Sequence, residues 1–392
     1  MYINERMVSG MELCELKDCV GCFSCMNVCP KHAITVEHDK LKKTVPKINA
    51  QLCVECGLCR KSCPVLNESE FNEPDKCYAA WTLDKDDQIN CASGGIATAL
   101  SRVFMKKGGK VFGTDWDDEL NLNIRMANDE SDLEKFKSSK YVQSFVGNSY
   151  TKAKEELIKG ERVLYIGTPC QIDGLLHFLG KKYDNLYTVD IICHGAPPIE
   201  YLKEYVHSIL PDKTVSEIKF RGENNYQLTI FDGTECLYNV RAYDDFYFET
   251  FLKGVTYRDN CYSCKYARRD RVSDLTIGDF WGLDKNTLKE QYDGRISTIL
   301  ANSDKGKKLL DECMSAIHTE ERLYEEALKY NEQLNHPSKM HSDREVFIKN
   351  YDGDFYKSVC KTSIGQRIKK DQKVNRIKSS GIYQTIKKVV KR

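Results

Sequence analysis

Two stretches of the sequence concentrate cysteines at the same spacing. The first motif, CVGCFSCMNVCP, spans residues 19–30, and the second motif, CVECGLCRKSCP, spans residues 53–64. Both read C-x2-C-x2-C-x3-C-P, a spacing in which three thiolates hold one [4Fe-4S] cluster and the fourth ligates another. The cysteine offsets repeat after 34 residues, so the motif is also an internal duplication.

The spacing predicts a crossed ligand assignment. One cluster is expected on Cys19, Cys22, Cys25 and Cys63, and the other on Cys53, Cys56, Cys59 and Cys29. Disulfides are one alternative, but they need an oxidising compartment, and the N-terminal residues show scattered charges without the apolar run of an export signal. Zinc is another, but it favours two well-separated C-x2-C pairs, which leaves the third cysteine of each motif surplus. The pattern favours a two-cluster ferredoxin-like domain over residues 10–68.

A further group of four cysteines follows from the expected order of elements. The pattern predicts a strand over 162–166, a helix over 171–180 and a strand over 186–195, which is a βαβ unit with parallel strands. Cys170 and Cys193 would then lie at the carboxyl ends of two strands, where parallel sheets gather their binding chemistry. Cys261 and Cys264 form a C-x2-C pair. Iron–sulfur or zinc would satisfy all four; alternatively, Cys170 and Cys193 are small buried side chains and the pair binds nothing.

Composition limits the class of protein. The length of 392 residues favours two or three domains, and 41% hydrophobic with 30% charged residues is typical of a globular protein. No run approaches the ~18 apolar residues of a membrane span. Eighteen cysteines without an export signal indicate a reducing cytoplasm. Residues 357–392 hold twelve basic and one acidic residue, so the remaining 47 basic and 57 acidic residues give the body a net charge of −10.

The remaining patterns predict alternating helices and strands. Residues 66–81 read as a polar linker, 110–116 and 121–128 as strands, and 96–109 and 151–160 as helices, with a capping box from Ser131 to Glu134. A hairpin is expected over 226–243 around Asp232-Gly233. The expected fold is α/β (α+β overall), divided into 10–68, 76–155, 156–335 and a basic helical tail over 336–392.

Five segments carry a resemblance to a known family. SGGIATAL, SKYVQS, GTPCQIDGL, DIICHGAPP and CYSCKYARRDRVSDLTIGDFWG resemble, in order, the family of coenzyme F420 hydrogenase/dehydrogenase beta subunits from about Lys76 to Asp284. The resemblance implies an FAD-binding α/β domain that exchanges electrons between iron–sulfur clusters and a substrate, which is the deazaflavin coenzyme in some members and another acceptor in others. It also implies a third [4Fe-4S] cluster on Cys170, Cys193, Cys261 and Cys264. The last 60 or so residues match no motif of the family.

The resemblance also implies where a flavin would bind. The expected residues are Ser93, Gly94, Gly95, Lys140, Tyr141, Gln143, Thr168 and Pro169. The first three precede a helix, so their amides could face a phosphate, although an ordinary serine-capped helix start would look the same. Lys140 would stabilise a reduced, anionic flavin, and Thr168 and Pro169 follow a strand end where the ring could stack.

Two further residues are candidates for the chemistry itself. His194 follows Cys193 and could donate protons to a flavin or hydrogen-bond a cluster sulfur, and Asp279 ends an apolar strand where it would shape the site. The charged run that includes Arg268, Arg269 and Arg271 is expected on a solvated face.

These observations predict an iron–sulfur flavoprotein oxidoreductase that works with a redox partner protein or ferredoxin and a small-molecule acceptor. One alternative is an electron-transfer subunit that serves a partner enzyme; another is a redox sensor, which is disfavoured because the basic tail lacks a nucleic-acid recognition motif. Residues 381–392 place an apolar arc opposite basic residues, a pattern typical of peripheral contact with the inner face of a membrane. The alternative for this segment is docking on the acidic body of the protein.

Overall fold

The computed structural model describes residues 13–222 and 225–379, which form two compact units. The first unit combines the chain up to 138 with 144–195 and 258–338, and the second combines 139–143, 196–257 and the chain from 339 onward. This division does not follow the boundaries expected from the sequence, because residues 196–257 separate from the segments on either side of them. No helix among the described residues is long and apolar enough to cross a membrane.

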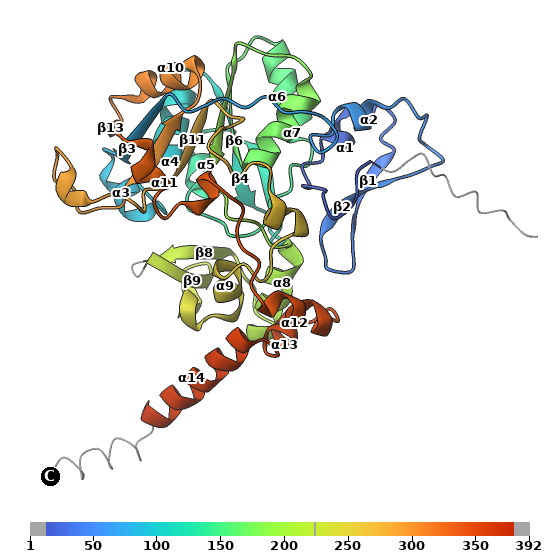
Figure 1. The fold of residues 1–392 in the computed structure, drawn as a ribbon, viewed down its shortest axis with the longest axis vertical. Helices are drawn as coiled ribbons and strands as arrows, with labels where there is room; N and C mark the ends of the chain where they lie inside the picture. The colour runs from blue at the N-terminus through green and yellow to red at the C-terminus, as the bar shows by residue number, and fades with distance from the viewer. Residues whose placement is uncertain (1–12, 223–224, 380–392) are drawn as a thin grey trace, which may run out of the picture. The chain divides into compact units, whose positions relative to one another are not determined.

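An eight-stranded mixed sheet forms the centre of the first unit, in the order β13-β3-β12-β11-β7-β6-β4-β5 (Figure 1). The strands are β3 (Lys76–Thr82), β4 (Lys110–Trp116), β5 (Leu122–Met126), β6 (Val163–Gly167), β7 (Leu186–Ile191), β11 (Leu275–Asp279), β12 (Ser297–Ala301) and β13 (Ile317–Arg322). The four central strands β11, β7, β6 and β4 pair in parallel, and the other pairs are antiparallel. The predicted βαβ unit is confirmed as β6, α7 and β7.

Helices cover both faces of this sheet. They are α3 (Lys85–Asn90), α4 (Ile96–Lys106), α5 (Glu130–Phe136), α6 (Ser149–Ile158), α7 (Pro169–Leu179), α10 (Asp304–Cys313) and α11 (Tyr324–Leu328), with short 3-10 turns η2 (Asp259–Ser263), η3 (Lys285–Thr287) and η4 (Glu332–Leu334). Successive strand residues point to opposite faces. Leu164 therefore packs in the core under α4 and α10, whereas its neighbour Tyr165 packs in the core under α6 and α7.

The cysteine-rich N-terminal part belongs to the first unit. It holds the antiparallel hairpin of β1 (Ile34–His38) and β2 (Thr44–Ile48), and the short helices α1 (Ser24–Val28) and α2 (Leu58–Lys61). Phe23, in the first motif, is 2% exposed and lies in the same core as Tyr150 and Phe178 of α6 and α7. By contrast, α2 of the second motif contains no buried residue. The first motif is therefore anchored in the core through Phe23, whereas the helix of the second motif is not buried.

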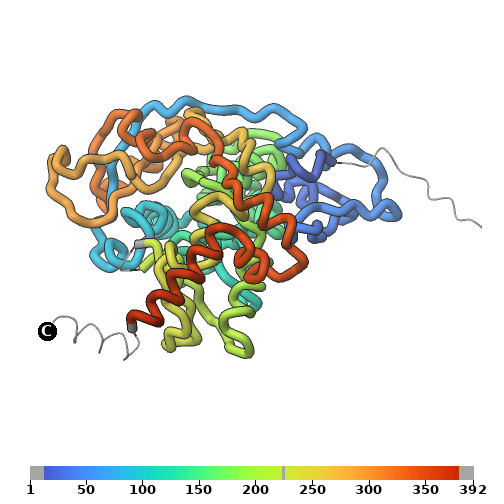
Figure 2. The backbone as a smooth tube through the Cα atoms, turned by 60° about the horizontal axis from the view of Figure 1, so that its bottom comes forward, coloured from blue at the N-terminus to red at the C-terminus, as the bar shows by residue number. Residues whose placement is uncertain are grey.

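Two local expectations are corrected. Residues 66–81 are not a linker throughout: the chain leaves the second motif, runs along the unit (Figure 2), and continues as β3, where Ala79, Ala80 and Trp81 are buried in the sheet. Ser131 does not cap a helix. Asp129 is the N-cap of α5 and accepts a hydrogen bond from the Ser131 amide, because a carboxylate just before the helix satisfies the first free N–H groups.

The second unit is built around a three-stranded antiparallel sheet in the order β10-β9-β8. Its elements are β8 (Glu217–Gly222), β9 (Asn225–Asp232), β10 (Glu235–Arg241), η1 (Ala242–Asp244), α8 (Ile199–Ile209), α9 (Phe246–Leu252), α12 (Asp343–Asn350), α13 (Phe355–Val359) and α14 (Ser363–Ser379). The predicted hairpin is confirmed: β9 and β10 pair around Gly233, whose φ of 56° suits glycine. The segment 381–392 lies outside the described residues.

Candidate functional site

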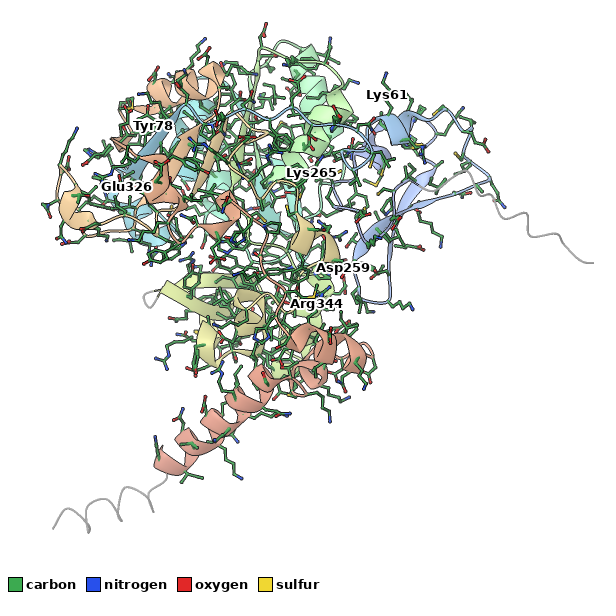
Figure 3. The ribbon with its side chains drawn as sticks, viewed as in Figure 1. Lys61, Tyr78, Asp259, Lys265, Glu326 and Arg344 are labelled. Carbon is green, nitrogen blue, oxygen red and sulfur yellow. The ribbon has the colours of Figure 1, made fainter. Side chains whose placement is uncertain are left out.

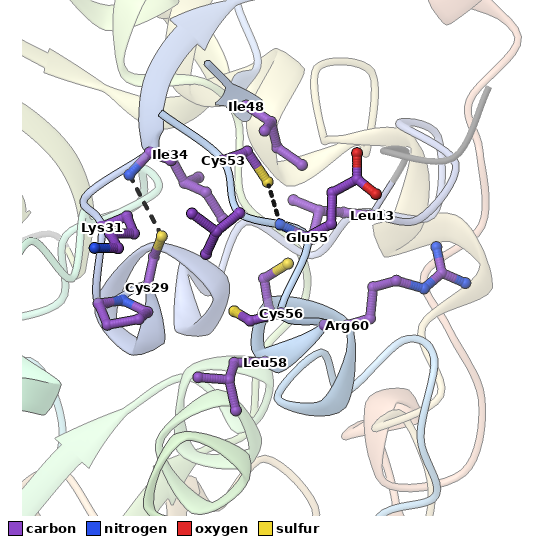
Figure 4. Close-up of a pocket in the computed structure, with 15 residues that line it drawn as sticks. Leu13, Cys29, Lys31, Ile34, Ile48, Cys53, Glu55, Cys56, Leu58 and Arg60 are labelled. Carbon is purple, nitrogen blue, oxygen red and sulfur yellow. Dashed lines mark hydrogen bonds between the residues drawn. The ribbon is translucent and has the colours of Figure 1, made fainter. Parts of the chain in front are cut away.

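Four cysteines surround a cavity of about 170 Å³ at the end of the ferredoxin-like part (Figure 4). These residues, the exposed set, are Cys29, Cys53, Cys56 and Cys59. The Ala33 amide donates to Cys29 Sγ and the Glu55 amide to Cys53 Sγ, each at 3.4 Å. Such N–H···S bonds stabilise thiolates that carry a cluster and help to set its potential. One member comes from the first motif and three from the second, which is the crossed combination expected from the spacing.

The other four motif cysteines line a second, smaller cavity. This buried set is Cys19, Cys22, Cys25 and Cys63, with exposed fractions of 8%, 7%, 9% and 8%. Cys14 lines the same cavity, and its thiol hydrogen-bonds Cys19 and Cys63 and thereby lowers the pKa of both. The sequence pattern indicates no role for Cys14, because it belongs to neither repeat and only the fold brings it beside them.

The two sets are neighbours, and the buried set also touches the sheet domain. Cys25 packs with Cys29 and Cys59 in one small apolar cluster. On the other side, Cys22 lies against Gly174 in the middle of α7: a Cβ added at Gly174 would be 2.6 Å from the Cβ of Cys22. Helix α7 can therefore approach the buried set closely because residue 174 has no side chain.

The third group, the core set, comprises Cys170, Cys193, Cys261 and Cys264. Cys170 lies in the first turn of α7 and Cys193 two residues after β7, while the other two lie in and just after η2. Burial raises the pKa of Cys193 well above its ordinary value, and the other three thiols raise it further, so the four lie within electrostatic reach of one another. Burial likewise raises the pKa of Cys170 to about 12. The fold thus brings together two strand ends and a C-x2-C pair from a distant segment.

The chemistry of these donors fits iron–sulfur clusters. Each set supplies four thiols, the ligand number that a [4Fe-4S] cluster takes, and all eighteen cysteines of the chain are free of disulfides. Within residues 13–222 and 225–379, no group of three or more His, Cys, Asp or Glu side chains is arranged to hold a single metal ion. The assignment of each cysteine to a cluster is a proposal drawn from this grouping.

The glycines expected at a flavin phosphate have clear roles inside the fold. The Gly94 amide donates to Ser297 Oγ at 2.9 Å, its carbonyl accepts from the Thr82 amide at 2.7 Å, and an added Cβ would lie 2.5 Å from the Ala80 carbonyl oxygen. Ser93 accepts a hydrogen bond from the Ser297 hydroxyl at 2.9 Å. Gly95, with a φ of 77°, is the N-cap of α4. A phosphate at this site would therefore be bound by Gly95 and the first turn of α4 rather than by the Gly94 amide.

The ring-binding candidates fall in different units. Lys140, Tyr141 and Gln143 belong to the second unit, where the Tyr141 ring packs 4.8 Å from Phe251 in an aromatic core and its hydroxyl accepts from Arg221 Nε at 2.8 Å. The Gln143 amide donates to the carbonyl of Pro197 at 3.0 Å.

Thr168 and Pro169 belong to the first unit and begin α7. The Thr168 amide donates to the Gln171 side chain at 3.0 Å, and its hydroxyl lies 3.2 Å from Cys170 Sγ.

Of the two predicted chemical residues, Asp279 ends a strand as expected, and His194 lies three residues beyond β7. His194 is exposed, and its carbonyl accepts from the Ser338 hydroxyl. Asp279 is the last residue of β11, and its carbonyl accepts from Asn331 at 3.1 Å. The prediction of a solvated face is wrong for Arg271, which is 2% exposed. Its guanidinium pairs at 3.0 Å with Asp190, because strand β7 places that carboxylate in the same buried region.

Two segments of the chain match known protein families. Residues 160–326 match the C terminus of the coenzyme F420 hydrogenase/dehydrogenase beta subunit. Residues 18–67 match the 4Fe-4S dicluster domain.

Curated relatives cover only part of the chain. It is 24% identical over 213 residues to a subunit of the F(420)H(2) dehydrogenase of Methanosarcina mazei, with 51% of this chain and 58% of that protein covered. It is 27% identical over 215 residues to the coenzyme F420-dependent sulfite reductase of Methanocaldococcus jannaschii, with 51% and 31% covered. The chain therefore spans less than two thirds of either relative.

A solved structure of the F420-reducing [NiFe] hydrogenase complex from Methanosarcina barkeri aligns with a TM-score of 0.45 and 15% identity, and it covers 65% of this chain and 85% of that one. The two family matches come from the sequence and do not depend on this structural alignment. Residues 160–326 are therefore similar to the C terminus of the coenzyme F420 hydrogenase/dehydrogenase beta subunit, and a segment similar to a 4Fe-4S dicluster domain precedes them.

Proposed function

We propose that this chain is an iron–sulfur oxidoreductase subunit that conducts electrons between an outside redox protein and a flavin-dependent reaction in its sheet domain. The observation that carries the proposal is the order of the three cysteine sets. The exposed set contacts the buried set through Cys25, and the buried set contacts α7, whose first turn holds Cys170 of the core set. A series of one-electron sites needs neighbouring clusters of this kind.

Different residues of the chain control access to the first cluster of this series and the exclusion of water from the next. Cys56 is exposed, so the exposed set is accessible to a redox partner such as a ferredoxin. The buried set is enclosed by Phe23 and α7, which exclude water from the middle of the series. Lower water content strengthens each electrostatic interaction with a charged cluster. This arrangement supports exchange of electrons with the outside protein at the exposed set and with the reaction at the core set.

The flavin is the finer part of the proposal. Clusters carry single electrons, and a bound FAD would supply the change between one-electron and two-electron chemistry. The support for FAD is the family of residues 160–326 together with Gly95 at the N-terminus of α4, a helix end that can accept a phosphate. His194 and Asp279 are proposed to face the reaction, as proton donor and as site-shaping residue.

The relatives guide the choice of acceptor. The names of both contain F420, so the deazaflavin is the first substrate to test, and another two-electron acceptor is the second. The competing function is an electron-transfer subunit without a substrate of its own. The two differ in one respect: only the first requires a flavin.

Anaerobic purification and reconstitution test the proposal. We expect about twelve iron atoms per chain from three [4Fe-4S] clusters, and release of FAD when the protein is denatured. Eight iron atoms would remove the core cluster from the proposal. Absence of FAD and FMN after incubation with excess flavin would favour the subunit without its own substrate. Deazaflavin turnover is then followed by its absorbance with a chemical reductant present.

A further inference from the structure

A short loop carries half of the core set and is tied to the buried set at both ends. This cysteine loop, residues 258–265, contains Cys261 and Cys264. At its start, the Arg258 side chain donates from Nη2 to the carbonyl oxygen of Cys19 at 3.0 Å. The carbonyl of Arg258 in turn accepts the amide of Cys261 at 3.0 Å. One residue therefore hydrogen-bonds a proposed ligand residue of each of two clusters.

The other end of the cysteine loop is also hydrogen-bonded to the chain next to the buried set. Lys265 follows Cys264, and its Nζ donates at 2.6 Å to the carbonyl of Pro64, the residue after Cys63. Near the start of the loop, Asp259 pairs with Lys43 of the β1–β2 hairpin at 2.5 Å. Figure 3 labels Asp259 and Lys265 on this part of the chain. The geometry fixes the loop against the buried set rather than leaving the two to move separately.

Arg258 is more deeply buried than Lys265, the residue that holds the other end of the loop. It is 2% exposed, whereas the Lys265 side chain is 37% exposed. Its guanidinium also donates to the carbonyl of Thr44 at 3.0 Å. A buried cation thus lies beside Cys19 of the buried set, and its own backbone is hydrogen-bonded to Cys261 of the core set.

We propose that Arg258 is a positioning residue that holds the buried-set cluster and the core-set cluster in register and makes both easier to reduce. The inference rests on the proposed function, since it requires both clusters. A fixed positive charge in a poorly hydrated site favours the state with the extra electron, and cluster potentials respond to local charge and solvent exposure. The exposed set lies beyond the buried set and should feel this charge less.

The test compares three variants of the full chain by iron analysis and by EPR-monitored potentiometric titration. Arg258→Met should keep about twelve irons and make two clusters about tenfold harder to reduce, a shift of 59 mV for a one-electron couple. The third cluster should shift by clearly less. Arg258→Lys restores the charge and should bring both potentials back most of the way. Arg344→Met is the control, because Arg344 is also buried and also donates to backbone carbonyls, those of Val255 and Tyr257 in the second unit.

The outcomes separate this inference from the proposed function. Eight irons in the wild-type protein would overturn the core cluster and this inference together. Twelve irons with unchanged potentials in Arg258→Met, or an equal shift in Arg344→Met, would overturn this inference alone. If Arg258→Met loses iron while Arg258→Lys and Arg344→Met keep it, the positioning role is supported; loss in all three would contradict it.

Discussion

At the scale of single residues, neighbours decide what each cysteine can do. The two motifs have the same sequence spacing, but the exposed set faces a solvent-accessible cavity and the buried set is less than 10% exposed. Cys14 adds a fifth thiol to the buried set without belonging to either repeat. Identity and spacing therefore predict the ligands, and the fold decides how each cluster is exposed.

The crossed assignment gives the first prediction. Cys29→Ala should damage the cluster at the exposed set, and Cys63→Ala the cluster at the buried set, because each removes one of four thiolate ligands. EPR of the reduced protein and iron analysis measure which signal disappears. Cys236→Ala is the matched control and should keep every cluster, because Cys236 is an exposed cysteine that belongs to none of the three sets. Loss of the same signal from Cys29→Ala and Cys63→Ala would contradict the crossed assignment.

Asp245 gives a prediction on pH. It is buried at the N-terminus of α9, and burial raises its pKa to about 6, although it accepts hydrogen bonds from Tyr205, Tyr238 and the Phe248 amide. Since the folded protein then binds this proton more tightly than the unfolded chain, stability should fall as pH rises from about 4 to about 6 and stay level above. A rise from 3.8 to about 6 corresponds to roughly 3 kcal/mol in all.

Hydrogen exchange of the α9 amides between about pH 4 and 7, corrected for the intrinsic pH dependence of exchange, measures this effect. Asp245→Asn keeps a polar side chain at the helix start and cannot ionise, so its protection should not vary over this range. An equal loss of protection in the wild-type protein and in Asp245→Asn would assign the slope to another group.

At the scale of elements, helix α7 joins the cysteine-rich part to the sheet. Its first turn holds Cys170, and Gly174 in its middle lies against Cys22 and Tyr150. Glycine in a helix interior costs up to about 1 kcal/mol relative to alanine. That cost is offset here by the close approach that glycine permits.

Gly174→Ala is therefore expected to destabilise rather than stabilise. The added Cβ would be 2.6 Å from the Cβ of Cys22 and 2.9 Å from Tyr150 Oη. Overpacking of this kind costs roughly 1–3 kcal/mol, more than the gain in helix propensity. The measurement is iron retention during thermal unfolding. Glu155→Ala, at an exposed position of α6, is the control and should keep its iron; a more stable Gly174→Ala protein would show that the contact is loose.

Local patterns predicted the elements that lie close together in sequence. The βαβ unit, the β9–β10 hairpin and the strands β4 and β5 follow from periodicity and turn residues within a few tens of residues. The second unit did not follow, because it assembles an aromatic core from separated segments; Tyr141 packs against Phe251, and Tyr205 against Phe355. Arg258 was missed for the same reason: only the fold shows that it reaches Cys19.

At the scale of the whole molecule, charge is distributed unevenly. Twelve of the 59 basic residues lie in residues 357–392, which contain one acidic residue. Part of this segment is held in the second unit, where Arg367 of α14 pairs with Glu249 at 3.0 Å and Ile368 is buried. Further along α14, Val374 and Ile377 are 37% and 53% exposed.

The last twelve residues give a prediction that sequence alone supports. If residues 381–392 form a basic amphipathic helix, the full-length protein should float with anionic vesicles at low salt, and a chain ending at Ser380 should not. Each basic residue near an anionic surface contributes roughly 1 kcal/mol, so high salt should release the protein. If both chains stay unbound, the segment does not bind membranes.

The unequal exposure of the two motif cavities has a consequence for damage by oxygen. Oxidants and chelators reach an accessible cluster before an enclosed one, and Cys56 is open to solvent while Cys22 and Cys25 are covered. Brief exposure to air should therefore remove the cluster proposed at the exposed set before the one proposed at the buried set. A protein damaged in this way would lose its connection to outside electron carriers while keeping the enclosed cluster, and repair would require rebuilding one cluster at the surface rather than both.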